Sequence, residues 1–431
     1  MKLLIVGLGY VGLTHAAYLS SFHEVLGYDI DRNKIEALYA NVDYLFEPQL
    51  PATLAKNKKN IQWVHTLPES LADIAVVILA VGTPEAREGR CDLSFLHLAI
   101  DTVAPRLQKD SVIILRSTVP PGTYAQLRLR LAKLSRDDIQ LIGMPEFMVL
   151  GQTYGDLKQP TRVILGSVHT SHEPFVRNVF QYTLKVPFVV MAPESAELTK
   201  YASNTFLATK ISFINQMADI ADKVNANMDD VVKGMGLDPR IGTSYLQPGV
   251  GYGGSCFPKD IQAMQHLASD LGVESTMLRA TEQANLDHMH RFTETILSYF
   301  EEGIEGLNIA VCGLSFKGSS HDVRHSPALL VVDALVDQKA HITVYDQKAT
   351  FDFFELRGEK PCLAYTSDLK DALKNADVCV LLTDAPELKA LKAIDFIQLM
   401  KTPIIFDGRN LYSLASMKGT TYISVGRPRI Q

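Results

Sequence analysis

The distribution of apolar runs along the chain restricts its fold more than any other feature. Up to about residue 193, short apolar runs alternate with segments whose apolar residues recur every three or four positions. Strands that are apolar at nearly every position are typical of a parallel sheet covered by helices on both faces. We therefore expect a doubly wound α/β domain over residues 1–193. The runs lie at Leu3–Val6, Glu24–Ile30, Ile74–Val81, Val112–Leu115, Gln140–Ile142, Arg162–Leu165 and Phe188–Met191.

The middle of the chain has a different pattern. Glu194–Val224 keeps helical spacing with no internal proline or glycine, which predicts one long helix. Further helices are expected at Asp260–Leu271 and Ser275–Tyr299, so residues 194–302 form a helical domain. Alternating strands and helices return after Gly306, and this section opens with strand, glycine and helix as the first section does. Its strand-like runs lie at Asn308–Cys312, His341–Tyr345, Val378–Leu382 and Ile404–Phe406. The predicted fold class is therefore α/β, with two doubly wound Rossmann-like domains (1–193 and 303–431) joined by a helical middle domain with a long central helix.

Composition excludes several classes of protein. The 431 residues are 47% hydrophobic and 21% charged, and a net charge of −6 argues against nucleic-acid binding. No uninterrupted apolar run reaches the roughly 18 residues of a membrane span. The five cysteines are scattered, form no CxxC pair and no cluster with histidine that suggests a metal site, and so favour a reducing compartment such as the cytoplasm.

A glycine motif at the start of the chain indicates a dinucleotide site. Gly7-Leu-Gly9-Tyr-Val-Gly12 follows an apolar strand and opens a helix, where glycines allow a tight turn, a close approach to pyrophosphate and close helix packing. Asp29 ends the next strand, 17 residues after Gly12. A carboxylate there binds ribose hydroxyls and favours NAD over NADP, although Arg32 and Lys34 weaken that preference. FAD is the alternative cofactor, and a purely structural turn is the alternative role.

Two later turns lie where the nicotinamide end of a dinucleotide would bind. Val81-Gly-Thr83-Pro84 and Arg116-Ser-Thr118-Val-Pro-Pro-Gly122 both follow predicted strands. Open α/β sheets bind ligands beyond the carboxyl ends of their strands, so Thr83 and Thr118 are candidate cofactor contacts. Taken singly, each loop could equally be an ordinary turn rich in threonine and proline.

A cysteine beside a carboxylate suggests covalent chemistry. In Gly249-Val-Gly-Tyr-Gly-Gly-Ser-Cys-Phe-Pro-Lys-Asp260, Pro258 suits the first position of a helix, which places Cys256 just before a helix N-terminus that favours a thiolate. Asp260 follows four residues later, and a nucleophile near a base is what covalent catalysis requires. The alternative is a small buried cysteine without a catalytic role. The four glycines before Cys256 and the Pro-Lys-Asp sequence after it argue against this alternative.

Lys200 and Asn204 lie four residues apart on the long predicted helix and therefore share one of its faces. A lysine among apolar positions could stabilise an alkoxide, and an asparagine could orient it. Spacing alone favours the simpler interpretation, in which Lys200 is a solvated surface charge.

These motifs, in this order, resemble the UDP-glucose/GDP-mannose dehydrogenase family over essentially the whole chain. Asp238-Pro-Arg240-Ile-Gly242 is more similar to the UDP-glucose branch than to the GDP-mannose branch. The matching motifs are Gly7-Leu-Gly-Tyr-Val-Gly12, Ser117-Thr-Val-Pro120, Pro145-Glu-Phe147, Glu197-Leu-Thr-Lys-Tyr-Ala-Ser-Asn204, Gly253-Gly-Ser-Cys-Phe-Pro-Lys-Asp260, Gly313-Leu-Ser-Phe-Lys317 and Asp407-Gly-Arg-Asn410.

The resemblance implies an NAD-dependent oxidation of the UDP-glucose C6 alcohol to a carboxylate, with Cys256 as nucleophile. It places Lys200, Asn204 and Asp260 around the C6 oxygen, Thr118 and Glu146 near water, and Arg240 in a neighbouring subunit's site. The expected cofactor contacts are Gly7, Gly9, Tyr10, Val11, Gly12, Asp29, Lys34, Thr83, Thr118 and Arg324. The expected substrate contacts are Glu146, Phe147, Lys200, Asn204, Arg240, Tyr245, Gly253, Cys256, Phe257, Lys317 and Arg409.

Two positions depart from the family pattern. Leu150 stands where the family usually has a glutamate four residues after Glu146, and His325 stands where it usually has a glutamate before Ser-Pro. The first change weakens the expectation of full activity, or marks an altered substrate or cofactor contact.

Other functions stay open on the sequence. They are oxidation of GDP-mannose or a UDP-N-acetylhexosamine, a single oxidation of the 6-phosphogluconate dehydrogenase type, and non-catalytic binding of a nucleotide sugar. The partners expected are a UDP-sugar and further copies of the chain, in a homodimer or a higher homo-oligomer, with no nucleic acid, membrane or metal. Uronate for polysaccharide synthesis is the expected product.

Overall fold

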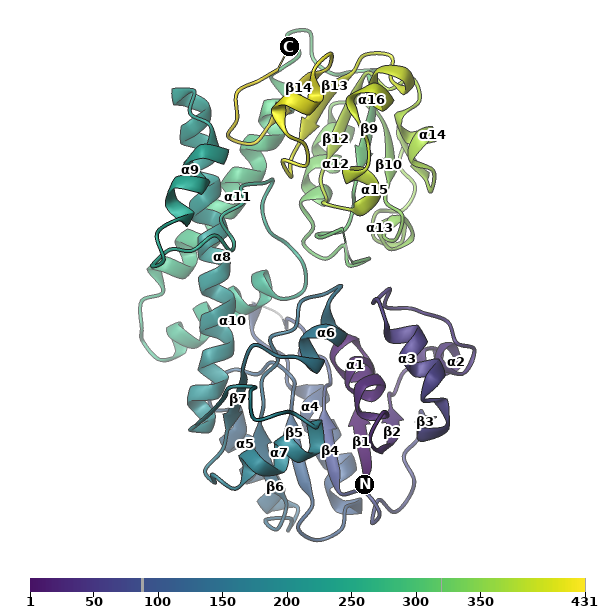
Figure 1. The fold of residues 1–431 in the computed structure, drawn as a ribbon, viewed down its shortest axis with the longest axis vertical. Helices are drawn as coiled ribbons and strands as arrows, with labels where there is room; N and C mark the ends of the chain where they lie inside the picture. The colour runs from purple at the N-terminus through teal and green to yellow at the C-terminus, as the bar shows by residue number, and fades with distance from the viewer. Residues whose placement is uncertain (87–88, 319, 431) are drawn as a thin grey trace. The chain divides into compact units, whose positions relative to one another are not determined.

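The computed structural model describes residues 1–86, 89–318 and 320–430, and it comprises two compact units (Figure 1). Unit 1 is Met1–Ser203 with Gln262–Leu267, and unit 2 is Asn204–Ile261 with Ala268–Gln431. The boundary falls inside the helix α8 (Pro193–Val224), which runs on unbroken. The predicted division into three domains at residues 193 and 302 stays a prediction.

Unit 1 is built on an eight-stranded sheet in the order β3-β2-β1-β4-β5-β6-β7-β8. The first six strands have the 3-2-1-4-5-6 order of a dinucleotide-binding fold, and all neighbours pair in parallel except β6 with β7. The strands are β1 (Lys2–Val6), β2 (Glu24–Tyr28), β3 (Ile61–Val64), β4 (Val76–Leu79), β5 (Val112–Leu115), β6 (Gln140–Gly143), β7 (Val163–Gly166) and β8 (Phe188–Met191). All seven predicted strands are confirmed, and β3 was not predicted.

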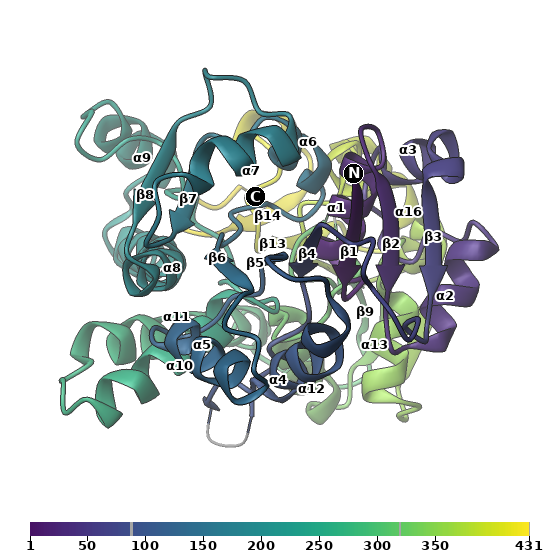
Figure 2. The same cartoon turned by 90° about the horizontal axis from the view of Figure 1, so that it is seen from below.

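Alternating side chains of β1 explain why helices cover both faces of this sheet. Leu3 and Ile5 belong to one buried cluster, whereas Leu4 belongs to another on the opposite face. Figure 2 shows α6 and α7 on one side of the sheet and α4 and α5 on the other. The helices of unit 1 are α1 (Tyr10–Leu19), α2 (Arg32–Tyr39), α3 (Leu50–Lys56), α4 (Ser94–Val103), α5 (Thr123–Lys133), α6 (Thr153–Lys158) and α7 (His172–Phe180).

Unit 2 carries a second parallel sheet of six strands in the order β11-β10-β9-β12-β13-β14. Renumbered within the unit, this is again 3-2-1-4-5-6, so the prediction of two Rossmann-like sheets is confirmed. The strands are β9 (Asn308–Cys312), β10 (His341–Tyr345), β11 (Leu363–Thr366), β12 (Val378–Leu381), β13 (Ile404–Asp407) and β14 (Thr421–Ser424). β11 and β14 were not predicted.

The helices of unit 2 include the predicted helical section. Unit 2 holds the later part of α8, α9 (Met228–Gly236) and α11 (Thr276–Leu297). α10 (Phe257–Asp270) belongs to unit 2 except for Gln262–Leu267, which belong to unit 1. The helices around the second sheet are α12 (Pro327–Asp337), α13 (Thr350–Arg357), α14 (Leu369–Leu373), α15 (Pro386–Lys389) and α16 (Ala393–Leu399). Over the ranges that the structure describes, no helix combines the length and apolar character needed to cross a membrane.

Candidate active site

The glycines of the first turn are required by its geometry. Gly7 has φ +90° and donates its N–H to Tyr28 O at 2.8 Å. A Cβ on Gly7 would lie 2.7 Å from Ala80 O, and a Cβ on Gly12 would lie 1.7 Å from Gly7 O. No atom lies within 4 Å of a Cβ built on Gly9. Gly7 and Gly12 therefore close the turn, whereas Gly9 leaves free space at the N-terminus of α1.

Asp29 is organised against this turn. Its side chain is buried, and its Oδ2 accepts the Leu8 N–H at 2.8 Å and lies 3.3 Å from the Lys34 ammonium. Its Oδ1 accepts the Asp31 N–H at 2.9 Å. A glycine turn, a helix N-terminus and a carboxylate at the end of the second strand fit the pyrophosphate and ribose of a dinucleotide. Tyr10 and Val11 form the first turn of α1 beside this space.

The two threonine loops are joined to each other. The Thr83 hydroxyl donates to Thr118 O at 2.7 Å, and the Ser117 hydroxyl donates to Val81 O at 2.7 Å. The loops follow β4 and β5, which are neighbours in the sheet. The strand order reverses between β1 and β4, because the chain adds β2 and β3 on one side of β1 and the later strands on the other side. Both loops border the crevice at this reversal, where such folds bind ligands.

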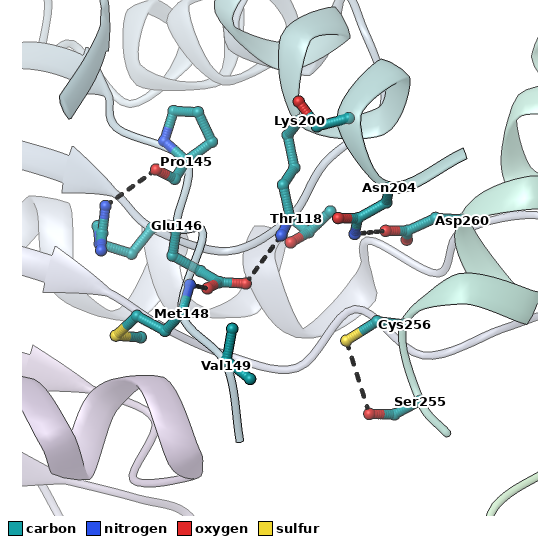
Figure 3. Close-up of polar contacts among 12 residues, drawn as sticks. Thr118, Pro145, Glu146, Met148, Val149, Lys200, Asn204, Ser255, Cys256 and Asp260 are labelled. Atoms are coloured by element: carbon teal, nitrogen blue, oxygen red, sulfur yellow. Dashed lines mark hydrogen bonds and ion pairs between the residues drawn. The ribbon is translucent and has the colours of Figure 1, made fainter. Parts of the chain in front are cut away.

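Lys200 forms a buried ion pair rather than a solvated surface charge, so the interpretation favoured by spacing is wrong. Its Nζ lies 3.1 Å from Glu146 Oε1, and the two side chains are only 6% and 11% exposed (Figure 3). Nζ also lies 5.3 Å from the ring centroid of Phe147, where the face of the ring attracts a cation. A buried ammonium beside a carboxylate can also interact with a further developing negative charge.

Glu146 is held ionised by its surroundings. Burial acts to raise its pKa, but Lys200, the Met148 N–H and Arg116 outweigh burial, so the net pKa lies below the ordinary value. Arg116 is buried and donates to Met144 O at 2.7 Å and to Pro145 O at 3.1 Å. These bonds fix the segment that leads into Glu146.

Arg116 is oriented in turn by a buried histidine. Arg116 Nε donates to His15 Nε2 at 3.0 Å, and the other ring nitrogen of His15 lies 2.6 Å from Val11 O. This arrangement assigns the proton to Nδ1. Burial and the Arg116 charge place the His15 pKa well below its ordinary value, so the ring stays neutral. The sequence predicted no role for His15 or Arg116. The only signal was a basic residue, Arg116, at the end of a buried strand.

Asn204 and Asp260 meet inside unit 2. The Asn204 side-chain amide donates to Asp260 Oδ2 at 2.7 Å (Figure 3). Lys259 Nζ lies 2.7 Å from Asp260 Oδ1. Asp260 is 1% exposed. Both carboxylate oxygens are therefore paired with donors, one of them cationic, which satisfies the buried charge. Lys259 was not predicted to contribute, although its place beside Asp260 could have suggested it.

Cys256 directly precedes α10, as the sequence predicts. Its carbonyl accepts the Asp260 N–H at 2.9 Å, and its Sγ lies 3.8 Å from the Ser255 hydroxyl. The side chain is exposed, in contrast to the alternative of a buried structural cysteine. α10 begins at Phe257, so Pro258 occupies the second helical position and not the first.

The glycine-rich loop before Cys256 packs closely on the second α/β fold. A Cβ on Gly253 would lie 2.0 Å from His325 O. Arg409 binds three carbonyls from separate segments, Leu382 O at 2.8 Å, Gly251 O at 3.1 Å and Phe316 O at 3.2 Å. The glycines thus permit a backbone contact, and the guanidinium holds the loop and two turns together.

The turn after β9 repeats the geometry of the first turn. Gly313 has φ +96° and donates to Tyr345 O at 2.7 Å, and the Leu314 N–H donates to Asp346 Oδ2 at 2.8 Å. The Lys317 carbonyl accepts the Ser315 hydroxyl at 3.0 Å, which orders the end of the same turn. Unit 2 therefore has a second candidate nucleotide crevice.

Comparison with protein families identifies the class of protein. Three models of the UDP-glucose/GDP-mannose dehydrogenase family match in order: the NAD binding domain over residues 1–184, the central domain over 194–287 and the UDP binding domain over 310–414. The chain belongs to this family. It is an NAD-dependent nucleotide-sugar dehydrogenase, and the cofactor expected from the first turn is confirmed.

Individual relatives agree over the full length. The chain is 36% identical to the UDP-glucose 6-dehydrogenase of Rhizobium meliloti (strain 1021), with 99% of this chain and 100% of the relative covered. It is 34% identical to UDP-glucose 6-dehydrogenase TuaD of Bacillus subtilis (strain 168), covering 100% and 94%. The UDP-glucose dehydrogenase structure from Pyrobaculum islandicum superposes with a TM-score of 0.89 at 30% identity, covering 99% and 98%.

Three predicted contacts are exposed or locally paired in this family member. The Arg240 side chain is 87% exposed and pairs with Asp238 at 2.6 Å. The Arg324 side chain is 63% exposed and pairs with Asp322 at 2.8 Å. Tyr245 has φ +63°, and its ring centroid lies 6.4 Å from that of Phe257. Their roles toward a neighbouring subunit, NAD and the sugar stay predictions.

Leu150, which departs from the family pattern, precedes two backbone N–H groups that donate to a carboxylate from an earlier part of the chain. The buried Glu47 accepts the Gly151 N–H at 2.5 Å and the Thr153 N–H at 3.3 Å. The second departure, His325, has φ +50° and contributes the carbonyl that packs against Gly253. Nothing in the structure explains why leucine and histidine replace the usual glutamates.

Proposed function

We propose that the chain oxidises the C6 alcohol of UDP-glucose to the carboxylate of UDP-glucuronate, using two NAD per sugar. Relatives at 34–36% identity over the full length are named UDP-glucose 6-dehydrogenases, which supports this substrate. The observation that carries the proposed chemistry is the bond between Asn204 and Asp260. It links the helix that bears Lys200 to the helix that Cys256 precedes, and so relates an oxyanion-stabilising group to a nucleophile.

The first oxidation converts the alcohol to an aldehyde. Bound NAD supplies the hydride acceptor for this step and for the second oxidation. The hydroxyl proton passes to Asp260, directly or through a water molecule. The ammonium of Lys200 stabilises the negative charge that develops on the C6 oxygen, and Asn204 orients that oxygen. The Glu146 carboxylate, 3.1 Å from the Lys200 ammonium, holds that ammonium in place.

The second oxidation uses a covalent intermediate. The Cys256 thiolate adds to the aldehyde carbon, which forms a C–S bond, breaks the C=O π bond and gives a thiohemiacetal whose oxygen carries the negative charge. Loss of a second hydride from that carbon leaves a thioester. Water, positioned by Thr118 and Glu146 and deprotonated by Glu146 or Asp260, attacks the thioester, and the C–S bond breaks to release the uronate and the thiol. The sulfur thus retains the aldehyde between oxidations.

The nucleotide half of the substrate is assigned to unit 2. The turn after β9 and the loop from Tyr245 to Gly253 supply backbone donors, with Lys317 and Arg409 as cations for the diphosphate. Arg409 already orders this loop through its carbonyl bonds. This assignment accords with the UDP binding domain that matches residues 310–414.

A second candidate substrate is a UDP-N-acetylhexosamine. The structure of the UDP-D-ManNAc dehydrogenase from Pyrococcus horikoshii superposes with a TM-score of 0.85 at 26% identity, covering 99% of both chains. A panel of UDP-glucose, UDP-N-acetylmannosamine and GDP-mannose, each assayed for NADH formation, tests the assignment. We expect kcat/KM to be highest for UDP-glucose. A higher value for either other sugar would refute it.

We also propose that the protein is a homodimer that works in the cytoplasm. Phe206, Phe213 and Ile220 recur every seven residues along α8 and are 64%, 44% and 51% exposed. Large apolar side chains exposed along one helical face are typical of a helix–helix interface between copies. All five cysteines are free thiols, which suits a reducing compartment.

A further inference from the structure

The N-terminus of α5 (Thr123–Lys133) is capped by a residue from a distant helix. Its own cap position is Gly122, with φ +95° and no side chain, and its first turn has no acidic residue. The N–H groups of Gly122 and Tyr124 nevertheless both have an acceptor. They donate to the two carboxylate oxygens of Glu197, each at 2.7 Å. A carboxylate at this position satisfies unpaired N–H groups and opposes the positive end of the helix dipole.

Glu197 connects two parts of the candidate site. It lies on α8, is 6% exposed and precedes Lys200 by three residues, or about one helical turn. Gly122 ends the loop that follows β5 and contains Thr118. The same loop accepts the Thr83 hydroxyl at Thr118 O. Glu197 thus joins the start of α8 to the loop at the carboxyl end of β5.

We propose that Glu197 is a positioning residue, which holds the loop of residues 116–122 in the shape that binds the nicotinamide half of NAD. The loop borders the crevice between β1 and β4, where a doubly wound sheet binds its dinucleotide. Loops are the most mobile part of such a fold unless they are tied down. Two charge-assisted bonds from a buried carboxylate provide that restraint.

The restraint depends on pH. Burial raises the pKa of Glu197 to about 7, and the neighbouring Glu194 charge also raises it, while the two backbone N–H groups oppose the shift. Tyr124 of α5 also faces the carboxylate, and its phenol lies within the influence of Arg128. The ionised carboxylate accepts both N–H groups, whereas protonation places a hydrogen on one of the two oxygens. The loop is therefore held most firmly above about pH 7.

The variant Glu197→Gln tests the proposal, because its amide has the shape of the protonated acid and only one acceptor oxygen. We expect faster hydrogen–deuterium exchange in peptides that cover residues 118–126 at pH 8, while other parts of unit 1 exchange as before. Glu194→Gln is the matched control. It removes an exposed carboxylate from the same helix and leaves both Glu197 bonds in place.

Direct NAD binding, measured by calorimetry without substrate, gives a second readout. At pH 8 we expect the Gln variant to bind NAD about tenfold more weakly than the wild type, the effect of losing one charge-assisted bond. At pH 6, where the wild-type carboxyl is itself mostly protonated, the two proteins should bind within about threefold of each other. Glu194→Gln should match the wild type at pH 8. At pH 6 it should bind NAD at least as tightly as the wild type, because loss of the Glu194 charge lowers the pKa of Glu197.

The wild type alone keeps the proposal testable if the Gln variant does not fold. Its 118–126 peptides should show extra exchange at pH 6 relative to pH 8, after correction for the intrinsic rate. Equal corrected exchange at both pH values would overturn the proposal. So would a folded Gln variant that leaves exchange or NAD affinity unchanged at pH 8, or that binds NAD equally weakly relative to wild type at pH 6 and pH 8.

Discussion

Lys200 and Glu146 are both buried, and each charge stabilises the other. Lys200→Met removes the ammonium with little change in volume. We expect kcat to fall by about 100-fold or more, because the charge that opposes the developing oxyanion is lost. The pKa of Glu146 should rise at the same time, since Lys200 is the largest influence that lowers it.

The rate of NADH formation between pH 5 and pH 9 checks both effects of Lys200→Met. Lys223→Met, an exposed lysine on the same helix, is the control and should keep the wild-type rate. A kcat for Lys200→Met within threefold of the wild type would contradict the assigned role.

Residues that act through distant partners could not be predicted from the sequence. The spacing of Lys200 and Asn204 predicted a shared helical face, but it favoured solvent exposure for Lys200. Its burial depends on Glu146, more than fifty residues earlier in the chain. His15 with Arg116 and Glu197 with Gly122 are likewise paired over long separations. By contrast, the roles of Gly7 and Gly12 are local, since a turn of this shape excludes a Cβ.

At the scale of elements, strands with a continuous apolar run were predicted, whereas three outermost strands without such a run were not. β1, β5, β8, β9 and β10 lie within one residue of their predicted ranges. β3 and β11 are outermost strands of their sheets, and only one of four residues in each is buried, at Trp63 and Leu363. Such strands lack the continuous apolar run. β14 is also an outermost strand. Its residues Tyr422–Ser424 are buried, but its sequence contains no continuous apolar run.

In the turn between β1 and α1, we expect Gly9 to be needed for binding NAD and Gly12 to be needed for the structure of the turn. Gly9→Ala adds a Cβ into open space at φ −74°, so the melting temperature should stay within about 2 °C of the wild type. The methyl group would nevertheless obstruct the pyrophosphate, and we expect NAD affinity to fall at least about tenfold. Gly12→Ala places its Cβ against Gly7 O and should lower the melting temperature itself.

Thermal melting and NAD calorimetry on these two variants check the distinction. Loss of stability in Gly9→Ala would show that Gly9 is needed for the turn itself. Unchanged NAD affinity in a folded Gly9→Ala protein would show that the dinucleotide does not approach α1 in this way.

At the scale of the whole molecule, two units repeat one design. In each, a glycine with positive φ follows the first strand, and the next N–H binds an aspartate at the end of the second strand: Leu8 with Asp29, and Leu314 with Asp346. The sequence showed only that both begin with strand, glycine and helix. The common strand order and the two aspartate bonds required the structure.

Association of two copies is the second expectation at this scale. Phe213→Glu places a charge in the exposed apolar stripe of α8 and should reduce the solution mass, measured by light scattering, from two chains to one. Leu129→Glu changes an exposed leucine of α5 outside the stripe and should leave the mass at two chains. A wild-type mass of one chain, or a Phe213→Glu variant with an unchanged mass, would contradict the proposed interface.

The number of NADH molecules formed per UDP-glucose consumed tests the four-electron oxidation most directly. The wild type should give two, with UDP-glucuronate as the product. Cys256→Ser replaces the thiol with a hydroxyl on a side chain of similar shape, so it should not sustain turnover to the uronate. A wild-type ratio of one with release of an aldehyde, or unimpaired uronate formation by Cys256→Ser, would contradict the account.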